Sequence, residues 1–355
     1  MSNQINVLLT GAGFTANFGS PLARQIYNIL LNAAQVQHNE EIRELFLLDE
    51  NIKNSNYEAI YEQILSSVPN EDLKREFDNL LWTTFLNKVD FFSKTPQWVN
   101  YSGIKSQDYL LENFFIKFIC SKNKSIFFSL NQDLFIERQC SKLFKEYQPD
   151  NNHIKSKLNG MKMVEHPVRH LQRLGVDDAI TTRNVHAPLE GDLIQHISES
   201  NKENAKVDLE KWMNEDIPYT YYLKFHGSLD YSYEKRRLFI TGENKSGRIA
   251  SCPLTQFYSE KFEQVLLEYP CKLIIIGYGF QDEHINKIIS NFLTKSSEYD
   301  EIHVVDKMNL QNFMEKVSDR VDSKNLKSKL KSYHPDGLDV RTLASFLEPN
   351  LLGLE

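Results

Sequence analysis

The chain has 355 residues but only four cysteines, and no two of them form the Cys-x-x-Cys pair of a zinc ribbon or zinc finger. The four are Cys120, Cys140, Cys252 and Cys271. So few cysteines in so long a chain also argue against a disulfide scaffold. We therefore interpret them as ordinary, partly buried thiols.

The histidines do not form a metal motif either. His166 and His170 have the i,i+4 spacing that two ligands on one helix face need. Pro167 lies between them and weakens a helix there, and no nearby cysteine completes a site. We interpret both as core or surface histidines and expect no bound metal.

Long apolar runs are absent as well. The longest clean runs, such as Leu273 to Ile276, are far shorter than the roughly 18 residues that span a bilayer. The N-terminus has no Lys or Arg before Arg24 and only a short apolar stretch, Val7 to Leu9, unlike a secretory signal. The sequence therefore predicts a cytoplasmic protein without a membrane partner.

An excess of positive charge is also lacking. The chain has 41 Lys and Arg against 48 Asp and Glu, a net charge of −7. This balance argues against sequence-independent binding of nucleic acid. The basic segment 316–331 is interleaved with acidic residues, and we interpret it as a solvated helix face.

Strand and helix patterns alternate in two parts of the chain. Apolar, β-branched runs at 5–10, 125–130, 219–225, 273–276 and 302–305 predict strands, and helical periodicity follows several of them. Such alternation is typical of parallel βαβ units. We predict an α/β fold with a Rossmann-like parallel sheet and helices on both faces, interrupted by two mostly helical insertions.

The same pattern gives the expected domains. The Rossmann-like domain is discontinuous and comprises residues 1–35, 121–145 and 217–310. Residues 36–120 form a helical insertion, and residues 146–216 form a polar, partly helical insertion. Residues 311–355 are expected to be a C-terminal helical tail.

Two motifs follow the first two predicted strands, at the sheet edge where open α/β sheets bind ligands. Gly11-Ala12-Gly13 is a turn whose backbone amides can approach a pyrophosphate near a helix N-terminus; a tight turn without a ligand is an equally good interpretation. Ser129-Leu-Asn131-Gln-Asp133 places polar groups at the same edge, although Asn and Asp there can also be no more than a helix cap.

Two further motifs follow later strands. His226-Gly227 ends the strand at 219–225 and can present an imidazole that titrates near neutral pH; a structural histidine is the alternative. The segment from Gly277 to His284 is a glycine-rich turn from a buried strand into a helix, which suits a dinucleotide or is a plain turn.

The order of these motifs resembles the sirtuin superfamily. Gly11 to Arg24 reads G-A-G-F-T-A-N-F-G-S-P-L-A-R and resembles its signature G-A-G-[IF]-[ST]-x-x-x-G-[IVS]-P-x-x-R without a gap. Ser129 to Asp133 resembles its T-x-N-x-D, and His226-Gly227 its His-Gly. Gly277 to Phe280 takes the place of its nucleotide turn, and Asp306 that of its contact to the adenosine ribose. The resemblance covers about 1–32, 122–140 and 219–306.

The departures from that pattern point to one branch of the superfamily. Sirtuin deacylases carry a zinc ribbon of two Cys-x-x-Cys pairs, which this sequence lacks. Leu22-Ala23 replace the Asp-Phe before the arginine, so Ala23 is expected to leave the ribose more open to water, and Gly279 replaces a serine. Gly-Tyr-Gly-Phe-Gln-Asp-Glu-His-Ile-Asn is similar to the form in sirtuin-like domains of bacterial antiviral systems, which hydrolyse NAD.

This resemblance implies an NAD glycohydrolase that cleaves the nicotinamide–ribose bond to give nicotinamide and ADP-ribose. Asn131 and His226 would be the catalytic residues, Asn131 orienting the nicotinamide amide and the water and His226 engaging the ribose. NAD is the expected cofactor, used as substrate. The residues implied in its binding are Gly11, Ala12, Gly13, Thr15, Arg24, Asp133, Gly277, Tyr278, Gly279, Phe280 and Asp306.

The resemblance also implies a biological role as the effector of an antiphage abortive-infection system. Such an effector is expected to form a homo-oligomer and to have a companion activator, which in similar systems is a HerA-like ATPase, an Argonaute or a nucleotide pyrophosphatase. Two alternatives stay open: an NAD-dependent protein deacylase, and a non-catalytic sensor of NAD or ADP-ribose-type nucleotides.

Overall fold

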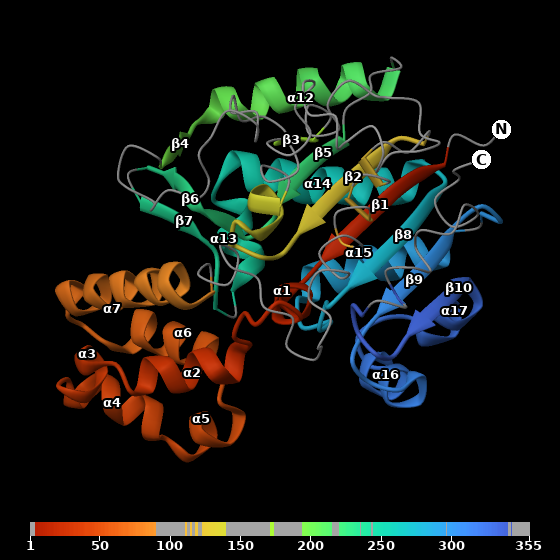
Figure 1. Ribbon diagram of the computed structural model, residues 1–355. Coiled ribbons are helices and arrows are strands. Elements are labelled where there is room, and N and C mark those ends of the chain that lie inside the picture. Colours follow the sequence, from red (N-terminus) through yellow and green to blue (C-terminus); the bar gives the residue numbers. More distant parts are fainter. Residues whose placement is uncertain are drawn as a thin grey trace, which may run out of the picture.

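The computed structural model describes residues 4–89, 111, 114–115, 118–119, 123–139, 171–173, 194–214, 220–234, 236–242, 244–295, 297–339 and 342. Seven of the described strands form one sheet, in the order β10-β9-β8-β1-β2-β5-β3 (Figure 1). They are β1 (Ile5–Thr10), β2 (Ser125–Ser129), β3 (Leu171–Arg173), β5 (Thr220–Lys224), β8 (Cys271–Ile276), β9 (Glu301–Val305) and β10 (Leu330–His334). Every neighbouring pair is parallel. The predicted Rossmann-like sheet is confirmed.

Aromatic side chains cover both faces of the sheet at β2. Because successive strand residues point to opposite faces, Phe127 packs on Phe118 with ring centroids 4.6 Å apart, while Phe128 packs on Phe262 at 4.8 Å. Phe262 belongs to α14 (Pro253–Glu268). Burial on both faces explains why the strands read as continuous apolar runs instead of alternating ones.

Helices on one side of the sheet are stacked against α14. Both α12 (Glu199–Asn214) and α15 (Glu283–Thr294) contact α14, and α17 (Ser323–Lys329) contacts α15. In Figure 1, α12 lies along the top of the molecule. It is the larger part of the 146–216 insertion that the structure describes, and it buries Leu209 and Trp212 in the sheet's core. The described part of this polar insertion therefore contributes to the folded core.

A separate helical layer precedes β2. We use this name for residues 23–89, which form α2 (Ala23–Leu31), α3 (Ala34–Gln37), α4 (Glu40–Leu47), α5 (Asp49–Asn54), α6 (Tyr57–Ser67), α7 (Glu71–Thr84) and the π-helix η1 (Phe85–Val89). The layer lies at the lower left of Figure 1 and has a hydrophobic core of its own. Trp82 ties it to the rest of the chain by donating a hydrogen bond from Nε1 to the carbonyl of Leu229 at 3.3 Å.

A small second sheet connects the helical layer to the main sheet. It has the order β4-β6-β7, with β4 (Gln195–Ile197) parallel and β7 (Arg236–Phe239) antiparallel to β6 (Gly227–Tyr233). The chain passes from β5 into β6 through Phe225 and His226 alone. Gly227 has φ +72°, and a Cβ atom there would lie 2.0 Å from the Leu238 carbonyl oxygen. The histidine is therefore held at the junction of the two sheets.

The described part of the segment 311–355, for which the sequence predicts a helical tail, contains two helices and then a strand. After α16 (Leu310–Val317) and α17, β10 joins the main sheet beside β9. Its residues read Leu-Lys-Ser-Tyr-His and are only partly buried, because β10 lies at the edge of the sheet. A polar edge strand lacks the apolar run by which the central strands can be recognised. Residues 343–355 lie outside the described residues.

Within the described ranges, no helix combines the length and the apolar character that crossing a bilayer requires.

Two glycine turns pack directly against each other at the carboxyl ends of β1 and β8. The turn after β1 leads into α1 (Ala12–Ala16), and the turn after β8 begins at Gly277, which has φ +62°. A Cβ atom on Gly277 would lie 2.1 Å from the amide nitrogen of Phe14 and 2.7 Å from the Cα of Gly13. No side chain fits between the two turns.

We predict that Gly277→Ala lowers the free energy of unfolding by about 2 kcal/mol or more, because it combines a left-handed backbone with an overlap that needs the turns to separate. Gly279→Ala is the matched control, since its Cβ would meet only the Gln281 side chain at 3.7 Å. It should change stability by less than about 1 kcal/mol. Urea unfolding measures both, and equal effects would contradict this account of the contact.

Candidate functional site

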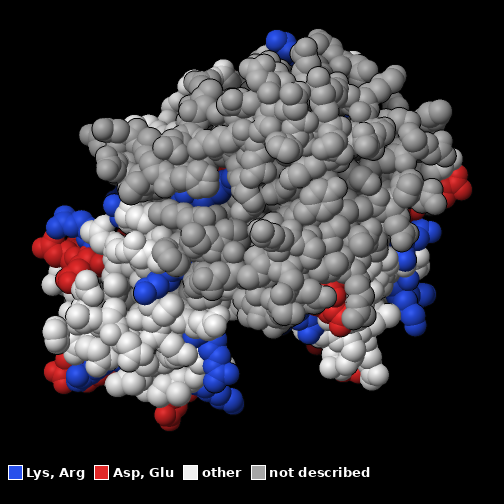
Figure 2. Space-filling model, in the orientation of Figure 1, with Lys and Arg blue, Asp and Glu red and all other residues white. Residues whose placement is uncertain are grey.

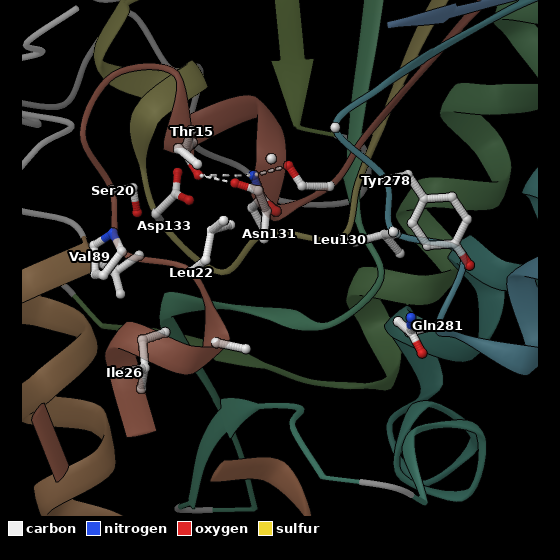
Figure 3. A pocket seen from close by; sticks show the side chains of 18 of the residues that line it. Thr15, Ser20, Leu22, Ile26, Val89, Leu130, Asn131, Asp133, Tyr278 and Gln281 are labelled. Carbon is white, nitrogen blue, oxygen red and sulfur yellow. Dashed lines mark hydrogen bonds between the residues drawn. The ribbon is translucent and has the colours of Figure 1, made fainter. Parts of the chain in front are cut away.

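A cavity of about 400 Å³ lies at the carboxyl ends of β1, β2, β8 and β9 and extends to the helical layer. Leu22, Ile26 and Val89 face it from the helical layer's side, and Tyr278 and Gln281 lie across from them (Figure 3). On its other side it reaches Lys307 and Lys316. In the space-filling view, a notch opens at the lower side between the helical layer and the segment around α16 (Figure 2).

All but two of the predicted site residues line this cavity. Those that do are Gly11, Ala12, Gly13, Thr15, Asn131, Asp133, His226, Gly277, Tyr278, Gly279 and Asp306. They come from five segments far apart in the sequence, and the parallel sheet brings them together because its strands end at one edge.

Arg24 and Phe280 are not in the cavity lining. Arg24 lies on the exposed face of α2. Phe280 is fully buried and packs against Phe313, with ring centroids 5.6 Å apart. Their predicted part in cofactor binding therefore gains no support from the cavity, because Arg24 is exposed to solvent and Phe280 fills the hydrophobic core.

The glycine amides of the first turn are engaged inside the protein. The Gly11 amide donates to the Ile276 carbonyl at 3.0 Å, and the Gly13 amide donates to the Gly277 carbonyl at 2.9 Å. Because both amides already donate hydrogen bonds within the protein, they are not available to a pyrophosphate in this structure. In this structure the glycines serve the close contact between the two turns.

Asn131 is anchored so that its side-chain oxygen is left for a ligand. Its Nδ2 donates to the Gly11 carbonyl at 3.1 Å and to Thr15 Oγ1 at 3.4 Å, which Figure 3 shows as dashed lines. The backbone amide of Asn131 donates to Ser129 Oγ at 3.1 Å. Among the described residues, no donor is bound to Oδ1, so this acceptor is available to a water molecule or a ligand amide.

The loop that carries Asn131 rests on a buried ion pair. The ammonium of Lys224 lies 3.0 Å from Glu137 Oε1, and both side chains are only 1% exposed. The same ammonium donates to the carbonyls of Gln132 and Asp133. Asp133 Oδ1 accepts from the Phe135 amide at 2.9 Å, so Asp133 both lines the cavity and begins a helix. These contacts fix the backbone that directly follows Asn131.

His226 has one engaged and one unpaired ring nitrogen. The imidazole makes a hydrogen bond with the backbone of Leu130, and Nε2 is buried without a partner among the described residues, so the bonded nitrogen is Nδ1. Burial lowers the pKa of His226 to about 3, and Lys245 and His284 contribute in the same direction. The imidazole is therefore neutral at neutral pH, and Nε2 carries a lone pair. An unpaired buried polar atom costs about 1–3 kcal/mol and calls for a functional explanation.

A cluster of charged side chains lies beside His226, and the sequence patterns did not predict it. The Lys245 ammonium lies 2.8 Å from Asp282 Oδ1 and 3.0 Å from Glu58 Oε2, and all three residues line the cavity. Glu58 Oε1 also accepts from Thr241 Oγ1 at 3.1 Å. Glu58 comes from α6, and Lys245 begins α13 (Lys245–Ala250). Asp282 stands inside the quoted glycine-rich motif, but no sequence pattern connects it with the other two.

The charges in this cluster depend on one another. Burial raises the pKa of Glu58 despite Lys245. Burial would also raise the pKa of Asp282, but the Lys245 ammonium and its hydrogen bond to Oδ1 act against burial, and that pKa lies below its usual value. Burial opposes the charged form of Lys245, yet the two carboxylates raise its pKa. One ammonium thus balances two carboxylates in the wall of the cavity.

Within the described ranges, no group of three or more His, Cys, Asp or Glu side chains is placed so that it could hold a metal ion. His166 and His170 lie outside those ranges, as do Cys120 and Cys140. Cys252 and Cys271 are free, buried thiols.

An open parallel α/β sheet with its cavity at the carboxyl edge defines a nucleotide-binding class of fold. Comparison with protein families makes this more specific: residues 191–330 match the family model of the SIR2-like domain. The match includes His226, Lys245 and the segment from Gly277 to Asp306, whereas Gly11 and Asn131 precede it. Residues 191–330 are therefore similar to a SIR2-like domain, which agrees with the sirtuin resemblance and with an involvement of NAD. No curated protein matches the chain.

We predict that His226 makes the protein less stable in mild acid. The unfolded chain binds a proton here below the ordinary pKa of 6.5, whereas the folded chain does not until about pH 3. Lowering the pH from 7.5 to 5 therefore favours unfolding by about 2 kcal/mol through this group. Urea unfolding of His226→Gln at both pH values should show a correspondingly smaller loss.

The exposed His38 provides the control. His38→Gln should lose as much stability as the unaltered protein between the two pH values. If His226→Gln behaves in the same way as His38→Gln, the histidine at the cavity is not buried in its neutral form.

Proposed function

We propose that the chain hydrolyses the bond between nicotinamide and ribose in NAD, releasing nicotinamide and ADP-ribose. One observation carries the proposal: Asn131 and His226, from the ends of two neighbouring strands, line one cavity. His226 Nε2 has no partner among the described residues, and the hydrogen bonds of the Asn131 side chain all use Nδ2, which leaves Oδ1 as an acceptor. The SIR2-like domain supports NAD as the ligand.

Cleavage of this bond does not require a strong general acid. The nicotinamide leaves as a neutral molecule from a cationic pyridinium, so the transition state resembles an oxocarbenium ion on the ribose. Asn131 Oδ1 would accept a hydrogen bond from the attacking water or from the nicotinamide amide. The neutral His226 would accept from the ribose. Oriented groups of this kind act by stabilising the transition state more than the bound substrate.

The site favours water as the acceptor of the ribosyl group. Leu22 and Ala23 stand at the cavity in place of the Asp-Phe of deacylases, and Leu22 is 44% exposed. A bulky ring that would shield the ribose is therefore missing at position 23. The sequence also lacks the cysteine pairs of the deacylase zinc ribbon. These two features support hydrolysis over transfer of ADP-ribose to an acyl-lysine oxygen.

We predict that Asn131→Ala and His226→Ala each lower NAD hydrolysis by at least roughly 10²-fold, the usual scale for loss of a positioned catalytic group. The release of nicotinamide from NAD by the activated enzyme measures this, with an acetylated peptide added in a parallel reaction. His38→Ala, at an exposed position on the helical layer, should keep full activity. Near-normal turnover in both site variants, or nicotinamide release only with the peptide, would contradict the proposed hydrolase.

We further propose that this activity makes the protein the cytoplasmic effector of an antiphage abortive-infection system. The support is the similarity of Gly277 to Asn286 to the motif of antiviral sirtuin-like domains. Loss of NAD stops the metabolism of the infected cell. An unrestrained enzyme would kill its own host, so we propose control by a homo-oligomer and by a companion activator of the HerA-like ATPase, Argonaute or nucleotide pyrophosphatase type.

The control should be visible in cells. We predict that the chain expressed alone leaves cellular NAD near its normal level, because binding of an activator is needed to shift the population toward an open site. Enzymatic assay of NAD in cell extracts, with His226→Ala as the reference, tests this. Rapid depletion by the unaltered chain without infection or partner would contradict the proposed restraint and leave the hydrolase proposal intact.

A further inference from the structure

Asp282 lies at the N-terminus of a helix, but its side chain does not cap that helix. It is the N-cap residue of α15, a position where the side chain ordinarily accepts a hydrogen bond from an amide of the first turn. Here the side chain makes no such bond. It is 8% exposed and lines the cavity, with Oδ1 bound to Lys245. Among the described residues, no donor is bound to Oδ2. The carboxylate is therefore held for contact with the cavity.

The unpaired nitrogen of His226 lies close to this carboxylate. Its Nε2 lies 3.9 Å from Asp282 Oδ1, too far for a direct hydrogen bond. Both groups are acceptors, because the imidazole is neutral and the carboxylate is ionised. Two acceptors do not bind each other, and a single hydroxyl has one hydrogen to donate. A ligand that satisfies both must bring two donors side by side.

A ribose supplies such a pair. Its 2′ and 3′ hydroxyls are on neighbouring carbons and on one face of the ring, and each has one hydrogen to donate. We propose that His226 Nε2 and Asp282 form an acceptor pair for the vicinal hydroxyls of the nicotinamide ribose, and that Lys245 and Glu58 are positioning residues for Asp282. The assignment of this ribose rests on the proposed function.

The charges around the pair fit this role. The groups that face His226 are Asp282 and His284 from the start of α15, Lys245 from α13, and the Leu130 carbonyl. Glu58 approaches from α6 through Lys245. Lys245 keeps Asp282 ionised, and Glu58 anchors the ammonium on its other side. A surplus of one negative charge remains next to the ribose, where positive charge develops as nicotinamide leaves.

Binding also requires a small opening of the site. Nε2 is buried in this arrangement, so the ribose reaches it only after neighbouring side chains move aside. The hydroxyl then provides the hydrogen bond that Nε2 lacks. Substrate binding is thereby coupled to the position of Lys245, and through Glu58 to the helical layer.

The experiment measures binding, at probe concentrations high enough for the ligand itself to populate the open site without an activator. The probe is carbocyclic NAD, in which the ribose ring oxygen next to nicotinamide is replaced by carbon so that the bond is not hydrolysed, together with its 2′-deoxy and 3′-deoxy forms. Calorimetry should show that the unaltered chain binds each deoxy form roughly 10-fold or more weakly than the parent, the scale of a hydrogen bond to a charged or unpaired buried acceptor.

The variants assign each hydroxyl to its acceptor. In Asp282→Asn, removal of one of the two hydroxyls should weaken probe binding by less than about 3-fold. Removal of the other hydroxyl should weaken binding as much as it does in the unaltered chain; this loss of affinity is the penalty for each hydroxyl. His226→Gln should show the reverse. Lys245→Met should reduce the same penalty as Asp282→Asn, and Lys245→Arg should restore it. Lys295→Met removes an ion pair with Asp300, outside the cavity lining, and should leave both penalties unchanged.

The outcomes separate this proposal from the proposed function. Equal binding of all three probes by the unaltered chain, or unchanged penalties in Asp282→Asn, would overturn the acceptor pair without affecting hydrolysis. A different result would separate the two proposals in the other direction. If removal of a hydroxyl weakens binding and Asp282→Asn abolishes that effect, but the protein never releases nicotinamide, the acceptor pair is supported and the hydrolase proposal is overturned. Failure to bind any of the probes would overturn both.

Discussion

The contact between two backbone turns is the constraint on which the site depends. Gly13 and Gly277 approach so closely that a Cβ on either would overlap the other turn. Their hydrogen bond joins the ends of β1 and β8, and the Gly11 carbonyl then receives the Asn131 side chain from the end of β2. Three strands are thus connected at one edge of the sheet by main-chain geometry. Asn131 is therefore positioned by this contact and not by its own loop alone.

Electrostatics connects this edge to the helical layer. A buried carboxylate is costly without a partner, so Glu58 and Asp282 both depend on the ammonium of Lys245. The helical layer has its own hydrophobic core, yet it supplies one of the charges in the cavity wall. The insertion is therefore part of the site, and a change in its position would be transmitted through a charged contact to the groups beside His226.

Parts of this site could be predicted from the sequence because they follow from the ends of strands. Asn131 and His226 come after apolar runs, and parallel strands end at a common edge, so their proximity follows from the fold class. Lys245 and Glu58 could not be found in this way. Glu58 lies in a helix of an insertion, and its side chain reaches the cavity only because the insertion packs against the second sheet. A pattern of residues along the chain carries no information about that packing.

Glycine and cysteine illustrate what the sequence determined by itself. The spacing of the glycines required a turn between strand and helix, and the missing cysteine pairs excluded a cysteine-built zinc ribbon, since both are properties of local chain geometry and ligand count. Only the tertiary structure decided that the amides of Gly11 and Gly13 are engaged within the protein, that Phe280 belongs to the core, and that Asp282 leaves its helix uncapped to stand beside His226. These outcomes depend on which segments pack together in the fold. Hydrogen-bond partners and burial are determined by contacts between residues that are far apart in the sequence, which local patterns do not specify.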